Sequence, residues 1–338
     1  RALRDDAGAA RGLLVLAASL ASVTANGGPR EQARRIHERL AGVPPTEAVL
    51  ADMQADVAGN NATDAAFTAM DNSSFYSVTL KNFAAPWTNR DQSVFVPLND
   101  YTATVIGMVR DDVPFNTLLS ANLVYVGTGG GIPAYSPASN DHYQALEDQN
   151  ADLKTRLVAS SQTAVSGLPD SATAGVITTR AAAEAFFIAG TNRAMFRFTM
   201  LNHLCRDMEQ VLDTRGVPDR IRQDVSRSPG GDSEIFLNNC YGCHSGMDAV
   251  AGAYAYYEWD ATQGRMLHTP GVVQAKYLIN GNVFPYGHIT ADNGWINFWR
   301  EGPNSLLGWR GASDRGFGAK SLGAEVGASR AFSVCQVE

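Results

Sequence analysis

Cys240-Tyr241-Gly242-Cys243-His244 is the most specific pentapeptide in this 338-residue chain. Its three prescribed side chains follow the pattern C-x-x-C-H, by which a c-type haem is attached to protein. The two thiols can bond to one porphyrin, and the imidazole that follows them can then ligate the iron. We therefore expect one covalent haem c on Cys240, Cys243 and His244, with His244 as the proximal iron ligand.

Other interpretations of the paired cysteines stay open. A C-x-x-C pair can also form a structural disulfide or a thioredoxin-like redox site. The redox site would follow a strand in a βαβ unit, and no such pattern surrounds residues 240–244. A zinc site would need a second Cys or His pair at ligand spacing, and we find none in the sequence. Haem attachment is the interpretation that the sequence favours.

The composition and the lengths of the apolar runs argue against a nucleic-acid partner and against a transmembrane segment. With 45% hydrophobic and 18% charged residues, the chain has an ordinary globular composition. Its formal net charge is −7 and it has no basic stripe to neutralise phosphates, so we expect no nucleic-acid partner. The apolar run at residues 12–25 is too short to span a bilayer as a helix. We expect no transmembrane segment, and we assign this run to a buried helix.

The cysteines also bear on localisation. Haem attachment of this type takes place outside the cytoplasm, in an oxidising space that also permits disulfides. The chain starts at Arg1 without a Met, which fits an exported protein whose signal has been removed. We expect a periplasmic, outer-membrane or extracellular protein. Cys205 and Cys335 are then expected to form one disulfide, with two buried free thiols as the alternative.

Helical patterns dominate the chain. Apolar residues recur at helical spacing in residues 29–40 and 180–212. Gly- and Pro-rich stretches, such as residues 127–137 and 215–232, are typical of loops. We predict a mostly α fold in which a helical N-terminal domain packs with a cytochrome c-like haem domain containing long loops. The expected parts are an N-terminal domain at residues 1–165, a helical connecting region at 166–232 and a haem c-binding domain at 233–338.

Some predictions concern single residues. Thr46 is predicted to cap one helix, and Asn99 or Asp100 to cap another. His37 and His142 are predicted to lie at the surface. A stripe at four-residue spacing is predicted to lie in the core: Phe196, Met200, Leu204 and Met208.

Several short motifs occur together in residues 170–338. They are Gly175-Val176-Ile177-Thr178, Thr191-Asn192-Arg193 with Leu204-Cys205, Met247-Asp248 after the pentapeptide, Tyr257-Glu258-Trp259-Asp260, Leu322-Gly323-Ala324-Glu325, and the closing segment Ser329 to Cys335. This set resembles a family of large, mostly uncharacterised exported bacterial proteins with one C-x-x-C-H near the C-terminus. The resemblance implies a predominantly helical, cytochrome-like protein of the monohaem type. It also supports Cys205 and Cys335 as a structural pair, and it supplies no substrate.

The ligand on the second side of the iron would decide the function. Two protein ligands suit electron transfer, whereas an open position admits peroxide or another small ligand. Three residues in polar, Gly- and Pro-containing segments lie far enough downstream of the motif to reach that side: Met266, His268 and His288.

Two functions are predicted on this basis. The first is a monohaem c-type cytochrome that carries electrons between redox partner proteins. One haem is sparse for a chain of 36.1 kDa, so we expect a subunit of a larger assembly, either homo- or hetero-oligomeric. The second is a haem enzyme of the peroxidase type with an open distal site, where His268 or Arg265 would be the acid–base group. Electron transfer is the favoured hypothesis, and no catalytic residue is assigned.

Overall fold

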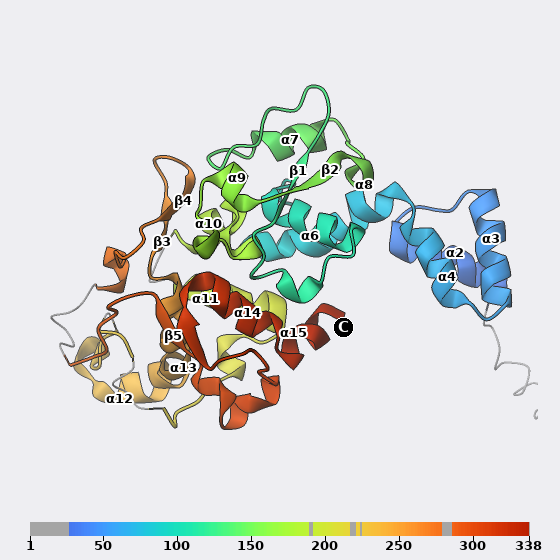
Figure 1. Ribbon diagram of the computed structural model, residues 1–338. Coiled ribbons are helices and arrows are strands. Elements are labelled where there is room, and N and C mark those ends of the chain that lie inside the picture. Colours follow the sequence, from blue (N-terminus) through green and yellow to red (C-terminus); the bar gives the residue numbers. More distant parts are fainter. Residues whose placement is uncertain (1–26, 189–191, 217–220, 224, 279–285, 338) are drawn as a thin grey trace, which may run out of the picture. The chain divides into compact units, whose positions relative to one another are not determined.

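The computed structural model describes residues 27–188, 192–216, 221–223, 225–278 and 286–337 (Figure 1). The helix predicted at residues 12–25 lies outside these ranges. About 55% of the structure is helical and its strands are few and short, which confirms a mostly α fold. The chain divides into two compact units, Arg1–Phe75 and Tyr76–Glu338. The boundaries predicted after residues 165 and 232 fall inside the second unit and stay predictions.

The described part of the first unit is a helical cluster. It contains α2 (Pro29–Ala41), α3 (Glu47–Ala58) and α4 (Ala62–Met70). Thr46 accepts a hydrogen bond from the backbone N–H of Val49, which confirms it as the cap of α3. The three helices bury one shared apolar core: Ala33, Leu50, Met53, Ala65 and Ala69.

The second unit begins with helices around a small antiparallel ladder. Its centre is α6 (Asp100–Arg110), which is buried from residue 100 to residue 108. Asn99 caps α6 by accepting a hydrogen bond from the N–H of Thr102, as predicted. Strand β1 (Val124–Gly127) contacts α6 and pairs with β2 (Leu157–Ser160), with Val124 opposite Ser160. The surrounding elements are η1 (Phe75–Leu80), α5 (Lys81–Ala84), η2 (Ala85–Thr88), η3 (Phe115–Thr117), α7 (Asp141–Asp148), α8 (Leu153–Arg156) and α9 (Gln162–Ser166).

The prediction that His37 and His142 lie at the surface is wrong. Both are buried, with 1% and 4% of their surfaces exposed. Nδ1 of His37 lies 2.8 Å from the carbonyl oxygen of Val43, and Nε2 of His142 accepts a hydrogen bond from the N–H of Gly127. Both imidazoles serve to bond backbone groups that burial would otherwise leave unpaired.

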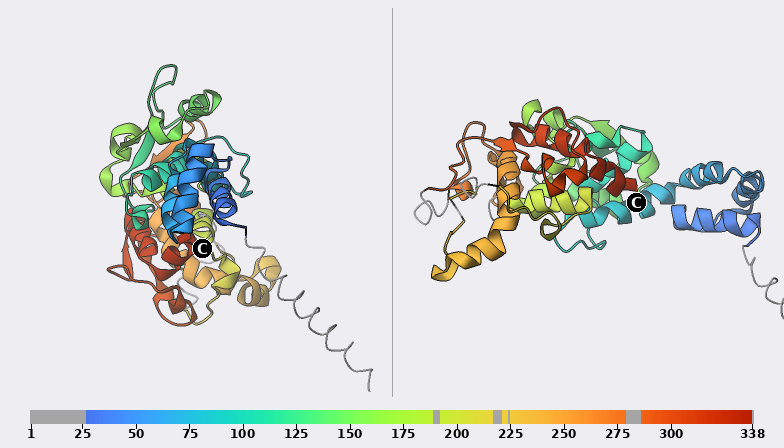
Figure 2. Two further views of the ribbon diagram at one scale, coloured as in Figure 1. Left: turned by 90° about the vertical axis from the view of Figure 1, so that its right-hand side faces the viewer. Right: turned by 90° about the horizontal axis from the view of Figure 1, so that it is seen from below.

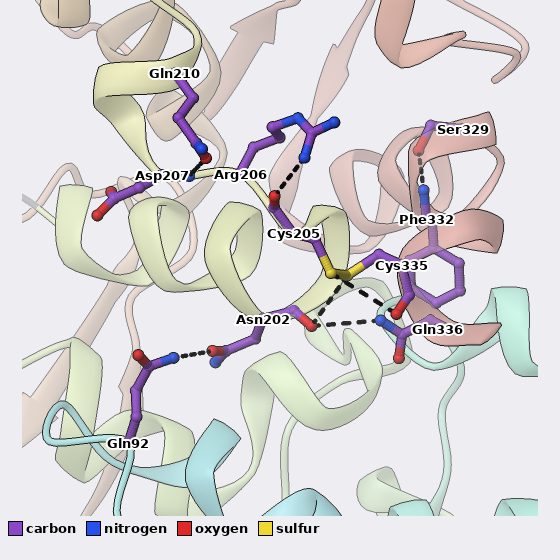
Figure 3. Close-up of a disulfide and its surroundings, with 10 residues drawn as sticks. All are labelled: Gln92, Asn202, Cys205, Arg206, Asp207, Gln210, Ser329, Phe332, Cys335 and Gln336. Atoms are coloured by element: carbon purple, nitrogen blue, oxygen red, sulfur yellow. Dashed lines mark hydrogen bonds between the residues drawn. A yellow bond between two sulfur atoms is a disulfide. The ribbon is translucent and has the colours of Figure 1, made fainter. Parts of the chain in front are cut away.

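The C-x-x-C-H motif belongs to a second group of helices in the same unit. Helix α11 (Arg193–Leu204) packs against α13 (Tyr241–Ala251) and against α15 (Arg330–Val337), and the red C-terminal helices lie beside it (Figures 1 and 2). Within the stripe predicted to be core, Phe196, Met200 and Leu204 are buried on α11, and Met208 is buried just after it. Cys205 and Cys335 form the expected disulfide, which joins the end of α11 to α15 (Figure 3).

The rest of the second unit consists of short elements and loops. Strand β3 (Tyr257–Asp260) pairs with β4 (Arg265–His268), and β5 (Gly294–Ile296) pairs with β6 (Arg315–Phe317), both antiparallel. Among the described residues, no helix combines the length and apolar character that crossing a membrane requires. The remaining helical elements are η4 (Asp170–Ala172), η5 (Gly175–Thr178), α10 (Arg180–Phe186), η6 (Met208–Gln210), η8 (Pro229–Gly231), α12 (Ser233–Ile235), η9 (Phe236–Cys240), η10 (Gly252–Tyr254), η11 (Ala275–Tyr277), η12 (Phe298–Arg300), η13 (Pro303–Leu307) and α14 (Gly318–Gly327).

Candidate haem-attachment site

The pentapeptide lies at the start of helix α13. Cys240 is the last residue of η9, and the next four residues form the first turn of α13. Residues three and four apart share one side of a helix, so Cys240, Cys243 and His244 face the same way. Both cysteines are free thiols of intermediate exposure, and 21% of the His244 side chain is exposed. The backbone therefore brings the three predicted side chains together and leaves them accessible.

The elements before the motif are helical. Helix α12 and the π-helical turn η9 lead directly into α13, with no strand between them. A thioredoxin-like site would place its cysteines after a strand of a βαβ unit, so this context does not favour it. Within the described ranges, no group of three or more His, Cys, Asp and Glu side chains is placed to hold a bare metal ion.

The two cysteines have different surroundings. Cys240 packs against a small apolar cluster that contains Ile221, Phe236 and Tyr241. Cys243 lies with its Sγ 3.9 Å from the carbonyl oxygen of Met208. Burial raises the pKa of the Cys243 thiol, and nearby carboxylates add to the effect. This thiol is therefore protonated at neutral pH.

A buried carboxylate contacts the imidazole of the motif. Nδ1 of His244 lies 3.1 Å from both carboxylate oxygens of Asp248, one helical turn further along α13. The Asp248 side chain has no exposed surface. An ionised carboxylate can only accept a hydrogen bond, so Nδ1 of His244 is the donor. In the neutral imidazole with its proton on Nδ1, the other ring nitrogen, Nε2, is the one that carries a lone pair.

Two arginines hold Asp248 in its charged form. Arg193 donates to it from Nε at 2.5 Å and from Nη2 at 3.2 Å. The backbone N–H of Arg222 donates to it at 3.4 Å, and the guanidinium of Arg222 lies 3.8 Å away. Burial opposes the charge, but Arg193, His244 and Arg222 together outweigh it and lower the pKa of Asp248. The carboxylate is therefore ionised at any physiological pH.

The arginines are themselves fixed by the surrounding chain. Arg222 is 2% exposed, donates from Nε to the hydroxyl of Thr290 at 2.9 Å and lies over the ring of Tyr277. Asn192 directly precedes Arg193 and donates from Nδ2 to the carbonyl oxygens of Tyr254 and Tyr257, each at 2.7 Å. These contacts lock the start of α11 to the segment that follows α13. Thr191, the first residue of the Thr191-Asn192-Arg193 motif, lies outside the described residues.

Two cavities adjoin other faces of α13. One of about 210 Å³ is lined by Ser245, Gly246 and Trp299 among others. A second of about 500 Å³ is lined by Ala249 and His288, together with aromatic side chains. Ala249 lies about 140° around the helix from His244. The larger cavity is therefore separate from the side on which the imidazole of the motif is presented.

The three predicted distal ligands lie in two places. Met266 and His268 are both on β4. Met266 is buried and lines a small cavity with Tyr135 and Arg180 among others, while the His268 ring lies 4.8 Å from that of Tyr257 in a tilted arrangement. His288 lines the larger cavity with Ala249 of α13, and its backbone N–H donates to Ile221 beside Arg222. Of the three, His288 has described contacts that lead directly to the motif helix.

The arrangement contains residues that sequence reasoning did not single out. Arg193 and Asp248 lie within the short motifs of residues 170–338, and Arg222 lies in none of them. The sequence does contain a signal for one contact. His244 and Asp248 are four residues apart, and residues at this spacing on a helix are neighbours. The chain matches no family model, no curated protein and no solved structure. Any assignment of function therefore rests on the motif and its surroundings.

Proposed function

We propose that this chain is a monohaem c-type cytochrome that carries electrons as a subunit of a larger extracytoplasmic assembly. One observation carries the proposal: C-x-x-C-H forms a helical turn that presents two free thiols and an accessible imidazole on one side. Once bound, the haem would supply a one-electron couple at its iron. Residues 233–338 would form the haem-binding domain.

The side chains present fit this group. Cys240 and Cys243 would carry the two thioether bonds, since their spacing is that of the attachment pattern. His244 keeps its proton on Nδ1 through the contact with Asp248. Nε2 of His244 is then the nitrogen that can ligate iron, in the tautomer that ligating histidines usually adopt.

The rigidity of the site supports electron transfer. His244 is held by a carboxylate that is itself fixed by two arginines from different parts of the chain. A ligand held in this way moves little when the charge on the metal changes. His268, His288 and Met266 stay the three candidate distal ligands; His288 lines the cavity beside Ala249, which lies on a different face of α13 from His244. The disulfide between Cys205 and Cys335 supports an oxidising location.

One observation favours the second candidate function, a haem enzyme of the peroxidase type. A carboxylate that accepts a hydrogen bond from a ligating imidazole increases the basicity of the ligand. Strong donation from the proximal side favours cleavage of an O–O bond. Burial lowers the pKa of His268, so this imidazole would be available as a base if the distal position were open.

The test of covalent haem uses the two cysteine pairs as matched controls. The full chain is exported in cells that attach haem c, and bound haem is measured after denaturing electrophoresis and as the pyridine haemochrome. We expect one haem per chain in the parent protein and in C205A/C335A. The variant C240A/C243A should hold none. A parent chain without covalent haem would overturn the proposal.

Spectra of the loaded protein then separate the two functions. A carrier with two protein ligands should show a low-spin spectrum in both oxidation states, and loss of that spectrum in H288A, H268A or M266A identifies the distal ligand. Rapid spectral change of the ferric protein with cyanide or peroxide would favour the enzyme. Sedimentation as a monomer would count against the assembly.

A further inference from the structure

We propose that Asp248 is a positioning residue for the haem ligand, which holds the proton of His244 on Nδ1 and lowers the reduction potential through that hydrogen bond. The inference rests on the proposed function and deepens it, because it assigns a role to a side chain outside the pentapeptide. It is carried by the geometry of Asp248 and by the charges around it.

The hydrogen bond is built into the helix. Because His244 and Asp248 are four residues apart on α13, the backbone itself fixes the distance between them. Both carboxylate oxygens lie 3.1 Å from Nδ1, and the carboxylate is completely buried. Water therefore cannot compete for the imidazole N–H, and the orientation of the ring is set before any ligand binds.

The arginines determine how Asp248 acts. Arg193 binds its carboxylate through two nitrogens, and Arg222 approaches it with both the backbone N–H and the guanidinium. Guanidinium and backbone N–H groups can only donate, so the carboxylate of Asp248 is the acceptor toward both arginines as well as toward His244. The arginines also draw negative charge away from the imidazole. Through its hydrogen bond, Asp248 thus makes His244 a stronger electron donor to iron than an isolated imidazole. The two arginines limit this increase.

The direction of the expected change follows from this arrangement. A more basic imidazole stabilises the ferric form, and removing the acceptor charge therefore raises the reduction potential. Loosening of the site acts in the opposite direction, because water that enters stabilises the more charged ferric form. The sign of the shift in D248N therefore distinguishes a specific role of Asp248 from general damage to the fold.

The first test is a redox titration of the haem-loaded full chain. We expect D248N to change the ferrous-to-ferric ratio at a fixed potential by about tenfold in favour of ferrous, which is a rise of about 59 mV. D248E, which keeps the charge, should recover part of the shift. An unchanged or lower potential in D248N would overturn the inference while leaving the cytochrome assignment intact.

The matched control is another buried carboxylate that pairs with an arginine. Glu325 has a side chain 2% exposed and lies 2.7 Å from Arg300. The variant E325Q should lose stability, as any broken buried pair does, but should keep the parent potential. If the reduction potential changed equally in E325Q and D248N, the change in D248N would not be specific to the residue that contacts His244. That result would overturn the inference.

A second test needs no haem. In the full chain with C240A/C243A, ¹⁵N NMR of the imidazole reports which nitrogen of His244 carries the proton. We expect it on Nδ1 with Asp248 present and a shift toward Nε2 in D248L, which removes the acceptor. A proton on Nε2 in the presence of Asp248 would overturn the inference whether or not haem binds. Absence of haem in the parent protein would instead overturn the proposed function, and with it the effect on the potential, while the position of the proton on His244 would still be tested by the NMR result.

Discussion

Cys335 is bonded to Cys205 across 130 residues of sequence, so the last helix is tied covalently to the end of α11. Cys205 ends α11 in a left-handed conformation, with φ of 51°. Gln336 donates to the carbonyl oxygen of Asn202 at 3.3 Å beside the disulfide (Figure 3). Phe332 on α15 stacks against His203 on α11. The covalent link therefore reinforces a packed contact between two helices.

Removing the disulfide should destabilise the protein strongly. We expect C335S to lower the free energy of unfolding by about 2–5 kcal/mol, since the bond closes a long loop in the unfolded chain. Urea unfolding with and without a reductant measures the loss. Reductant should bring the parent protein to the level of C335S and should leave C335S unchanged. A parent protein that is insensitive to reductant would contradict the prediction.

His203 should make stability depend on pH in a defined range. It is 1% exposed, its Nε2 lies 2.6 Å from the hydroxyl of Tyr101, and burial lowers its pKa to about 3. The unfolded chain takes up this proton near pH 6.5 and the folded one does not. The stability that the unprotonated His203 contributes is therefore fully present above pH 6.5 and is lost as the pH falls toward 3. The expected slope is about 1.4 kcal/mol per pH unit.

The variant H203Q isolates this effect, because glutamine keeps a polar group near Tyr101 but does not titrate. Urea unfolding of both proteins at pH 4, 5, 6 and 7 gives two stability curves. Groups other than His203 contribute equally to both and cancel in the difference. We expect the difference to change steadily between pH 6 and pH 4. Parallel curves would show that His203 is charged in the folded protein or that it titrates normally.

The local part of the fold could be predicted from the sequence. Thr46 and Asn99 act as the caps that their side chains indicated, because a cap bonds an N–H within one turn. The burial of His37 and His142 could not be predicted in this way. Their partners are backbone groups of loops, and a backbone group leaves no signature in a pattern of side chains.

In the candidate site too, the local contacts could be predicted from the sequence and the long-range contacts could not. The side of α13 that carries the cysteines and His244 follows from helical spacing alone, and so does the contact of His244 with Asp248. The arginines could not be predicted, because Arg193 and Arg222 lie 55 and 26 residues away from Asp248 in sequence. Their approach depends on how α11 and the segment at residues 221–223 pack against α13. That packing is a property of the whole unit.

Gly246 should not tolerate a side chain, although it lies inside a helix. A Cβ at this position would fall 2.2 Å from Nε1 and 2.3 Å from Cε2 of Trp299, which is 1% exposed. Alanine favours the helix by about 1 kcal/mol over glycine, but overpacking typically costs about 1–3 kcal/mol. We expect G246A to lower stability by up to about 2 kcal/mol overall and to alter the fluorescence of the displaced indole.

A control for G246A is available in a loop of the same unit. A Cβ on Gly130 would have no neighbour within 4 Å. G130A should therefore leave stability unchanged or raise it slightly, because alanine restricts the unfolded chain. Urea unfolding of the two variants gives the comparison. If both changed stability equally, close packing against Trp299 would not be the cause.

Among the residues near the start of α11, Asn192 should be the one whose substitution lowers the stability of the protein most. It is fully buried, has φ of 61° and bonds the carbonyl oxygens of Tyr254 and Tyr257. N192A loses both donors and keeps the strained backbone. Each buried carbonyl left unpaired costs about 1–3 kcal/mol, and the left-handed conformation adds about 1–2 kcal/mol for alanine. We expect a loss of several kcal/mol, measured by urea unfolding.

The order of three variants at this position tests the explanation. N192G also loses the two hydrogen bonds, but glycine adopts positive φ readily, so the loss should be smaller than in N192A. N192D should be worse than N192A, because a carboxylate would direct negative charge at the carbonyls of Tyr254 and Tyr257. The expected stability order is therefore N192G, then N192A, then N192D. If N192D were as stable as the parent protein, the amide group would not be the donor that holds α11 to the segment after α13.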